Sequence, residues 1–192
     1  MRISSGIFKG RKIGEKKLFE KKHGKDDLRP TPAKVREAIF DILRGELEGS
    51  SFLDLYAGTG TMGIEAASRG AGRVIFVESV RSRAEAIQQT VDKIGLAGGS
   101  EIHCEKAEMF LKQASRSGKQ YDIIFADPPY ASEEVEKILS LIDEYGILDI
   151  QGVVLFEHAK KKKVFEKIGT LMLKKQYRYG DTMLALYRKE RC

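Results

Sequence analysis

The chain has 192 residues, of which 42% are hydrophobic and 32% charged, and its formal net charge is +6. This length fits one domain with a sizeable core, and the composition is typical of a globular protein that dissolves in water. No apolar stretch approaches the roughly 20 residues that span a bilayer, and the first residues lack a signal-peptide core, so we expect a cytoplasmic protein with no membrane partner.

The N-terminal segment is strongly basic. Residues 1–25 hold nine basic and two acidic side chains, whereas the remainder of the chain is close to neutral. Weak alternation around its glycines predicts one or two short strands and then a flexible loop near 21–27. We interpret residues 1–28 as a small basic β extension and residues 29–192 as the main domain. Such an extension fits an arm that contacts phosphates, and a solvated lysine-rich tail is the alternative.

The main domain opens with a predicted helix. Thr31 is suited to the N-cap and Pro32 to the first helical position. Lys34 and Arg36 lie off the apolar face, where they either point into solvent or contact phosphate. The apolar face consists of Val35, Ala38, Ile39, Ile42 and Leu43.

From residue 51 onward, apolar runs alternate with amphipathic segments. This order predicts an α/β fold, with a mostly parallel sheet and helices on both of its faces. The expected strands are 52–56, 74–77, 102–104, 123–126 and 153–156. The expected helices are 64–68, 82–94, 107–114 and 135–142. A closing antiparallel hairpin is expected from 171–177 and 183–187.

A glycine-rich loop follows the first of these strands. Gly58, Gly60 and Gly63 form the pattern G-x-G-x-x-G, which allows a tight turn and close approach of a ligand. Glu78 lies 20 residues after Gly58, at the tip of the next strand, where a carboxylate can accept both hydroxyls of a ribose. The pattern fits either a dinucleotide or S-adenosylmethionine. The predicted cofactor contacts of the loop are Asp54, Tyr56, Ala57, Gly58, Thr59 and Gly60.

The most informative residues are Asp127, Pro128, Pro129 and Tyr130, which follow the apolar run 121–126. The prolines hold the chain extended at a strand tip, where open α/β sheets bind their ligands. The Asp127 carboxylate and the Pro128 carbonyl offer two acceptors beside an aromatic ring, which suits a flat group carrying an NH2. We predict that Asp127, Pro128 and Tyr130 are catalytic and that Asp127 also reaches the cofactor. An N-cap role for Asp127 and a core position for Tyr130 are the alternatives.

Two features favour S-adenosylmethionine as the cofactor. The chain lacks room for the second domain with which dinucleotide enzymes often bind substrate, and the charge of Asp54 would be unfavourable beside a pyrophosphate. A nicotinamide-dependent oxidoreductase is the alternative. The two cysteines and three histidines have no metal-ligand spacing, and we predict no metal site.

The sequence resembles the bacterial 16S ribosomal RNA guanine-N2 methyltransferases, within the class I methyltransferases. The matching segments are 1–3 with Gly6, 9–12, 28–31, 35–37 with Phe40, 53–60, Glu78, 127–130 and 179–182. The resemblance implies a Rossmann-like, seven-stranded sheet with an antiparallel last strand, S-adenosylmethionine as cofactor, and methyl transfer to a loop guanine. It implies a monomer that acts on 16S rRNA in the 30S subunit or an assembly intermediate. A DNA adenine-N6 methyltransferase and a non-catalytic RNA-binding assembly factor are the rivals.

The resemblance also suggests residue roles. Many members place Asp or Asn directly before the alanine that opens the helix after the third strand, where it contacts the adenine amine. Lys106 stands there, before Ala107, and cannot accept that hydrogen bond. Adenine recognition then falls to backbone groups at Ala107 or to Glu108. The predicted RNA contacts are Arg2, Lys9, Arg11, Lys12, Arg29, Thr31 and Arg36.

Overall fold

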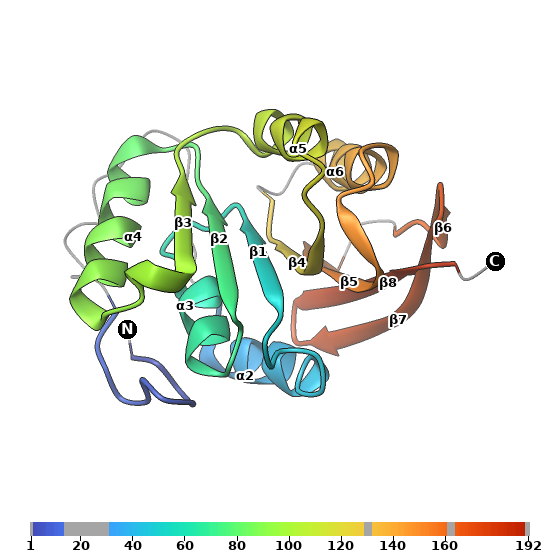
Figure 1. The fold of residues 1–192 in the computed structure, drawn as a ribbon. Helices are drawn as coiled ribbons and strands as arrows, with labels where there is room; N and C mark the ends of the chain where they lie inside the picture. The colour runs from blue at the N-terminus through green and yellow to red at the C-terminus, as the bar shows by residue number, and fades with distance from the viewer. Residues whose placement is uncertain (1, 14–30, 129–131, 161–163, 191–192) are drawn as a thin grey trace.

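The computed structural model describes residues 2–13, 31–128, 132–160 and 164–190, and these form one eight-stranded sheet with helices packed on it (Figure 1). Within these residues no helix has both the length and the apolar character needed to cross a membrane. The strands are β1 (Ser51–Leu55), β2 (Arg73–Val77), β3 (Ser100–His103), β4 (Tyr121–Ala126), β5 (Leu148–Ala159), β6 (Lys167–Ile168), β7 (Leu171–Tyr179) and β8 (Thr182–Lys189). The helices are α2 (Ala33–Ile42), α3 (Thr61–Ser68), α4 (Arg81–Ile94), η1 (Ala97–Gly99), α5 (Ala107–Arg116) and α6 (Ser132–Glu144).

The strand order places the ends of the central strands side by side. The sheet runs β3-β2-β1-β4-β5-β8-β7-β6, and the five strands from β1 to β5 are parallel. Leu55 pairs with Val77 on one side and with Ala126 on the other, and Ala126 pairs with Phe156. The carboxyl ends of β2, β1, β4 and β5 therefore lie at one edge. The strands β2 and β3 were added on one side of β1, and β4 and β5 on the other side, so the strand order reverses between β1 and β4. Open sheets bind their ligands at such a reversal.

The predicted fold class is confirmed, including the antiparallel last strand. β8 runs antiparallel to β5, and β7 runs antiparallel to β8. The expected number of seven strands is too low, because β6 adds a short antiparallel pairing of Lys167 and Ile168 with the start of β7. Two residues are too few to show an alternating pattern, so the sequence could not indicate this strand.

Helices cover both faces of the sheet (Figure 1). Phe52 of β1 is buried in one core cluster with residues of α2, α3 and α4, whereas Leu53 is buried in a second cluster with residues of α5 and α6. Because successive side chains of a strand point to opposite faces, residues at even spacings from Phe52 face α2, α3 and α4, and those at even spacings from Leu53 face α5 and α6.

The start of α2 differs from the prediction. The helix begins at Ala33 with Pro32 as N-cap and no side-chain cap, so the predicted Thr31 cap is wrong. The Thr31 hydroxyl instead donates to Glu157 Oε2 at 3.4 Å. Arg36 was expected at the surface, but it is only 3% exposed and faces the neighbouring helix α3. Arg36 is therefore absent from the surface predicted to meet RNA.

Residues 2–13 fold back against the body of the protein. Ile3 and Ile13 are both buried in the core that α2, α3 and α4 share. In place of the predicted strands, this segment contains one isolated antiparallel bridge between Arg2 and Lys12. The rest of the predicted extension lies outside the described residues. The segment is therefore an anchored loop that presents its charged side chains from a fixed base.

A buried carboxylate on α3 anchors this loop. Glu65 is fully buried and accepts hydrogen bonds from the backbone N–H groups of Ser4 at 2.9 Å and Ser5 at 3.0 Å. Its oxygens also lie 3.6 Å from Arg36 Nε and 3.1 Å from Arg69 Nε. Backbone donors from the loop, a cation from α2 and a second cation from the C-cap of α3 thus meet on one side chain.

Gly6 makes the close approach of the loop to α3 possible. Its φ is +81°, and a Cβ at this position would lie 1.7 Å from the Ser68 carbonyl oxygen. The N–H of Ile7 donates to that same carbonyl at 2.8 Å. Only glycine has both the backbone conformation and the space that this contact requires.

Candidate active site

Four acidic side chains stand at the carboxyl ends of four neighbouring strands. Glu78 directly follows β2, Asp54 is the penultimate residue of β1, Asp127 directly follows β4, and Glu157 lies near the end of β5. Each is an even number of residues from strand residues buried against α2, α3 and α4, so all four point to that face. The row spans the reversal between β1 and β4, which is the expected ligand site of such a sheet.

The environment of these acids favours their neutral forms. Burial, with a smaller effect of the nearby charges of Asp127 and Glu78, raises the pKa of Asp54 to about 8. Burial also raises the pKa of Asp127, and it raises that of Glu157 together with the charge of Asp127. A row of carboxyl groups in this state gains from a bound cation or from additional hydrogen-bond donors. Within the described ranges, no cluster of His, Cys, Asp or Glu is arranged to hold a metal ion.

The loop between β1 and α3 makes the tight turn that the glycine pattern predicted. Tyr56, Gly58 and Gly60 all have positive φ, at 65°, 55° and 69°. Gly60 is the N-cap of α3 in a left-handed conformation. A positive φ costs roughly 1–3 kcal/mol in a non-glycine residue such as Tyr56, and such backbone strain clusters at ligand sites.

Two of the acids hold this loop in place. The N–H of Gly63, in the first turn of α3, donates to Asp54 Oδ2 at 2.9 Å, so Asp54 fixes the end of the loop. Glu78 accepts from the N–H groups of Gly58 and Val80, both at 2.8 Å. The predicted ribose acceptor is therefore already part of the loop framework, and it is 5% exposed.

Comparison with known proteins agrees with this geometry. Residues 1–188 match the family model described as "Conserved hypothetical protein 95". The chain belongs to this family. The Bacillus subtilis protein named "Putative rRNA methyltransferase YlbH" is 33% identical over 189 residues, covering 98% of this chain and 99% of the relative. The Escherichia coli K12 protein "Ribosomal RNA small subunit methyltransferase D" is 26% identical, covering 99% and 90%.

Solved structures show the same fold over the whole chain. The structure named "Putative methyltransferase yhhF from Escherichia coli" superposes with a TM-score of 0.83 at 26% identity, covering 100% of this chain and 99% of that one. A Haemophilus influenzae structure named as a putative methylase has a TM-score of 0.78 at 26% identity, covering 100% and 99%. The family, the fold and the enzyme class of this chain are thus those of a methyltransferase.

The residues predicted to hold the acceptor lie at the end of β4. Asp127 is half-buried and Pro128 is buried, next to the glycine loop across the β1–β4 pairing. Tyr130, the third predicted catalytic residue, lies outside the described residues. Glu157 was not among the predicted site residues, although its place in the sequence resembles that of the other acids. The run 153–156 ends in an acid, as do the runs before Glu78 and Asp127.

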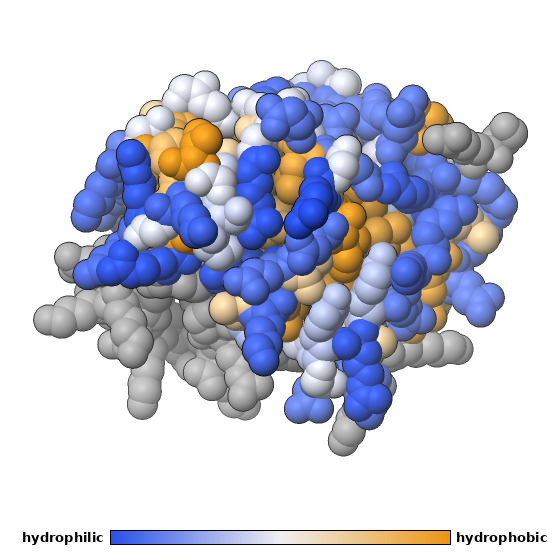
Figure 2. All heavy atoms as spheres, turned by 90° about the horizontal axis from the view of Figure 1, so that it is seen from below, coloured by the Kyte–Doolittle hydropathy of each residue, from blue (hydrophilic) through white to orange (hydrophobic). Residues whose placement is uncertain are grey.

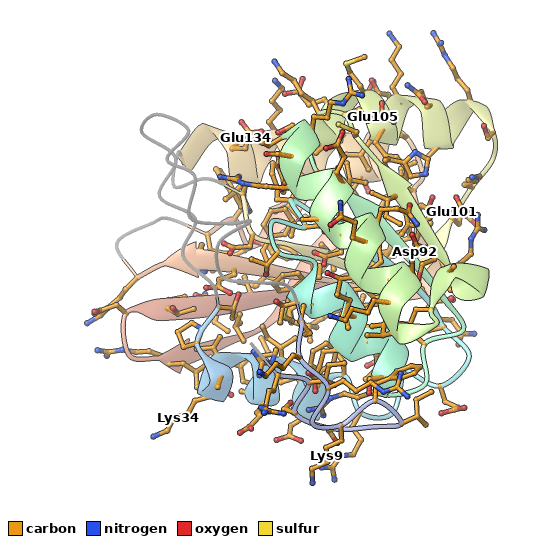
Figure 3. The ribbon with its side chains drawn as sticks, turned by 90° about the vertical axis from the view of Figure 1, so that its left-hand side faces the viewer. Lys9, Lys34, Asp92, Glu101, Glu105 and Glu134 are labelled. Carbon is orange, nitrogen blue, oxygen red and sulfur yellow. The ribbon has the colours of Figure 1, made fainter. Side chains whose placement is uncertain are left out.

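The other predicted cofactor residues border the same loop. The Tyr56 hydroxyl donates to Glu134 Oε1 at 2.8 Å, and burial with that contact raises the Tyr56 pKa. Glu108, predicted to read the adenine, pairs with Lys137 Nζ at 2.6 Å. Both contacts tie the predicted cofactor residues to α6, whose residue Glu134 is labelled in Figure 3.

Two more predicted cofactor residues, Ala57 and Ala107, are buried. Thr59, the remaining one, shares a hydroxyl contact of 2.7 Å with Thr61.

The predicted RNA contacts divide into two groups. Arg2, Lys9 and Lys12 are exposed on the anchored loop, together with Arg11, whose Nη1 donates to the Ile94 carbonyl at 3.0 Å. Figure 3 shows Lys9 pointing outward on the same side of the molecule as Lys34 of α2. This side is hydrophilic over most of its described surface (Figure 2). Arg36 is buried instead, the half-buried Thr31 donates to Glu157 of the acidic row, and Arg29 lies outside the described residues.

Proposed function

We propose that this chain transfers a methyl group from S-adenosylmethionine to the N2 amine of guanine 966 in 16S rRNA. The observation that carries the proposal is the position of Asp127 and Pro128 at the switch between β1 and β4, directly beside the glycine loop. Small-subunit rRNA methylation is also what several relatives are named for.

The cofactor fits the residues that surround the glycine loop. S-adenosylmethionine, when bound, supplies a methyl group activated by a positively charged sulfonium. The row of buried acids with raised pKa values suits a cation, whereas it would repel a pyrophosphate. Glu78 stands where a ribose hydroxyl can donate to the oxygens that already accept from Gly58 and Val80. The loop backbone between Tyr56 and Gly60 then lines the donor pocket.

The acceptor residues solve a specific chemical problem. The N2 lone pair of guanine is delocalised into the ring, which makes the amine a poor nucleophile. Asp127 and the Pro128 carbonyl accept its two N–H groups, which favours a pyramidal nitrogen with its lone pair aimed at the methyl group. The N–C bond forms as the C–S bond breaks, and Asp127 takes the released proton. We assign the stacking of the base to Tyr130, worth ~1–3 kcal/mol.

The substrate must present its guanine unstacked, because the N2 amine is not accessible in this way inside a helix. The exposed cations of the anchored loop, Arg2, Lys9 and Lys12, hold the flanking phosphates. The substrate is therefore an exposed rRNA loop in the small subunit or one of its assembly intermediates.

A methyl-transfer assay tests the proposal directly. The purified protein is incubated with labelled S-adenosylmethionine and small subunits from cells that lack this gene, and the digested rRNA is analysed by mass spectrometry. We expect one N2-methylguanosine at position 966. Labelled N6-methyladenine in a parallel DNA reaction would identify a DNA methyltransferase. Tight rRNA binding without any turnover would identify a non-catalytic assembly factor.

The affinity for S-adenosylmethionine, relative to S-adenosylhomocysteine, should rise about tenfold between about pH 6 and pH 9. Burial keeps protons on Asp54, whose pKa is about 8, and on Asp127 and Glu157. These groups lose their protons as the pH rises, and the ionised row then attracts the sulfonium that only the methyl donor carries. Calorimetry at constant ionic strength measures both affinities. The amino group is common to both ligands, so its titration cancels in the ratio of the two affinities. A ratio that stays constant or falls with pH would show that the acids do not face the sulfonium.

Replacing Lys9 and Lys12 together with alanine should weaken rRNA binding and make it less sensitive to salt. Each lost phosphate contact lowers the slope of log affinity against log salt by about 0.7–0.9, so the double variant should lose about 1.4–1.8. The matched control neutralises Lys112 and Lys119, which lie on and just after α5, on the opposite face of the sheet. Equal slopes for both double variants would remove the anchored loop from the RNA interface.

A further inference from the structure

Glu157 lies directly beside Asp127 at the edge of the sheet. Ala126 pairs in register with Phe156, so the two residues that follow occupy neighbouring positions on parallel strands roughly 5 Å apart. Asp127 comes two residues after Phe125, and Glu157 comes two residues after Leu155. Phe125 and Leu155 are buried in the same core cluster, so both carboxyl groups point to the same face of the sheet. The proposed mechanism uses Asp127 to hold the target amine and gives Glu157 no contact with the target base.

Among the described residues, one side-chain hydrogen bond is made to Glu157, and it engages one of the two carboxyl oxygens. The Thr31 hydroxyl donates to Oε2 at 3.4 Å from the segment that leads into α2. On the side of β5 away from β4, Glu157 pairs with Leu184 of β8, which is apolar and buried. Thr31 therefore orients the carboxyl group, and the Oε1 oxygen is the acceptor that a substrate can reach.

The electrostatics of the pair point to a ligand that brings donors. Burial raises the pKa of Glu157, and the charge of Asp127 raises it further. Two adjacent carboxyl groups in this state are stabilised by a partner with several N–H groups in a row. A guanine has such a row along its Watson–Crick edge, where N1–H stands next to the N2 amine. Hydrogen bonds from these N–H groups favour the ionised form of the carboxyl groups, and an ionised Glu157 repels the lone pair that adenine and 2-aminopurine present at N1.

We propose that Glu157 accepts the N1–H of the target base and thereby selects guanine, while Asp127 and Pro128 hold the adjacent amine. This inference rests on the proposed function and adds the residue that determines base specificity. A base extruded into a pocket is read by hydrogen bonds to this edge. A site built to receive a donor rejects an analogue that lacks it far more strongly than an apolar pocket does, because the polar group is left unpaired.

Substrates with 2-aminopurine at the target position test this assignment. The analogue keeps the N2 amine but carries no hydrogen on N1. At about pH 9, above the pKa of about 8 that burial and the charge of Asp127 give Glu157, the wild-type enzyme should prefer guanine by about 100-fold or more in kcat/KM. In Glu157→Gln the amide can donate to the N1 lone pair, so the preference should narrow at least about tenfold, mainly because methylation of the analogue improves. Equal losses on both bases would overturn the specificity role.

Two controls separate the possible failures. Glu101→Gln changes an acid of β3 that pairs with Arg73 outside the row, and the base preference should stay unchanged. Thermal unfolding and S-adenosylmethionine binding check that Glu157→Gln is folded. If it is not, the wild-type rates decide, because equal rates on guanine and 2-aminopurine overturn the inference without any variant. A wild-type enzyme inactive on guanine would instead refute the proposed function itself.

Discussion

Asp127→Ala should lower the turnover of rRNA methylation by about 10²- to 10⁴-fold, the range that a positioned proton acceptor contributes. The variant loses the carboxylate that accepts an amine N–H and that takes the proton after transfer. Binding of S-adenosylmethionine and rRNA should persist, because Asp54 and Glu78 hold the glycine loop and the loop cations lie elsewhere. Single-turnover assays with calorimetry of both ligands separate the chemical step from binding.

The matched control for this variant lies on the same strand. Asp122 is exposed near the start of β4, at the opposite edge of the sheet, where it accepts from the Ser51 N–H at 2.8 Å. Asp122→Ala removes the same group from the same element but leaves the site intact. Turnover should therefore stay near the wild-type value. Similar turnover in the two variants would show that Asp127 takes no part in methyl transfer.

Glu65→Ala should lower the free energy of unfolding by about 3–5 kcal/mol, as is typical when one partner of a buried ion pair is removed. The Arg36 guanidinium would lose its counterion at a side chain that is only 4% exposed. The backbone N–H groups of Ser4 and Ser5 would lose their acceptor as well. Urea denaturation followed by circular dichroism gives the free energy directly.

An exposed pair on α4 provides the comparison. Glu85 Oε1 lies 2.9 Å from Arg81 Nε, and its side chain is 59% exposed. Glu85→Ala should cost less than about 1 kcal/mol, because water already solvates both charges. A further variant, Glu65→Leu with Arg36→Met, should recover part of the stability, since it removes both buried charges together. If Glu65→Ala and Glu85→Ala cost the same, the anchoring role of Glu65 is wrong.

The sequence reveals the parts of this site that depend on local patterns. The apolar run that contains Asp54 and the runs that precede Glu78 and Asp127 predict strands with acids at or near their ends, because the period of a strand and the reversal of an open sheet follow general rules. The glycine loop is predictable for the same reason, since positive φ values favour glycine. These features needed no knowledge of which strand pairs with which.

Other parts depend on long-range pairing that a single sequence does not show. The partner of Arg36 on the neighbouring helix is 29 residues away in the chain, so a helical period can suggest exposure but cannot supply the buried carboxylate. Glu157 becomes relevant only when β5 is placed in register beside β4. The Thr31 hydroxyl was equally suited to a cap and to a distant acid, and the structure gives it to the acid.

The short helix α3 connects two distant regions of the protein. It begins directly after Gly60 of the glycine loop and ends at Ser68, whose carbonyl holds the N-terminal segment. At 1.5 Å per residue these eight residues span about 12 Å. Deleting the first 13 residues would therefore do more than remove positive charge. It would expose the apolar surface that Ile3 and Ile13 cover, and it would leave Glu65 without the backbone N–H groups that donate to it. Glu65 lies on α3, and this helix begins at the proposed donor pocket. Substitutions that neutralise exposed lysines without removing the segment are consequently the cleaner way to test how this enzyme binds rRNA.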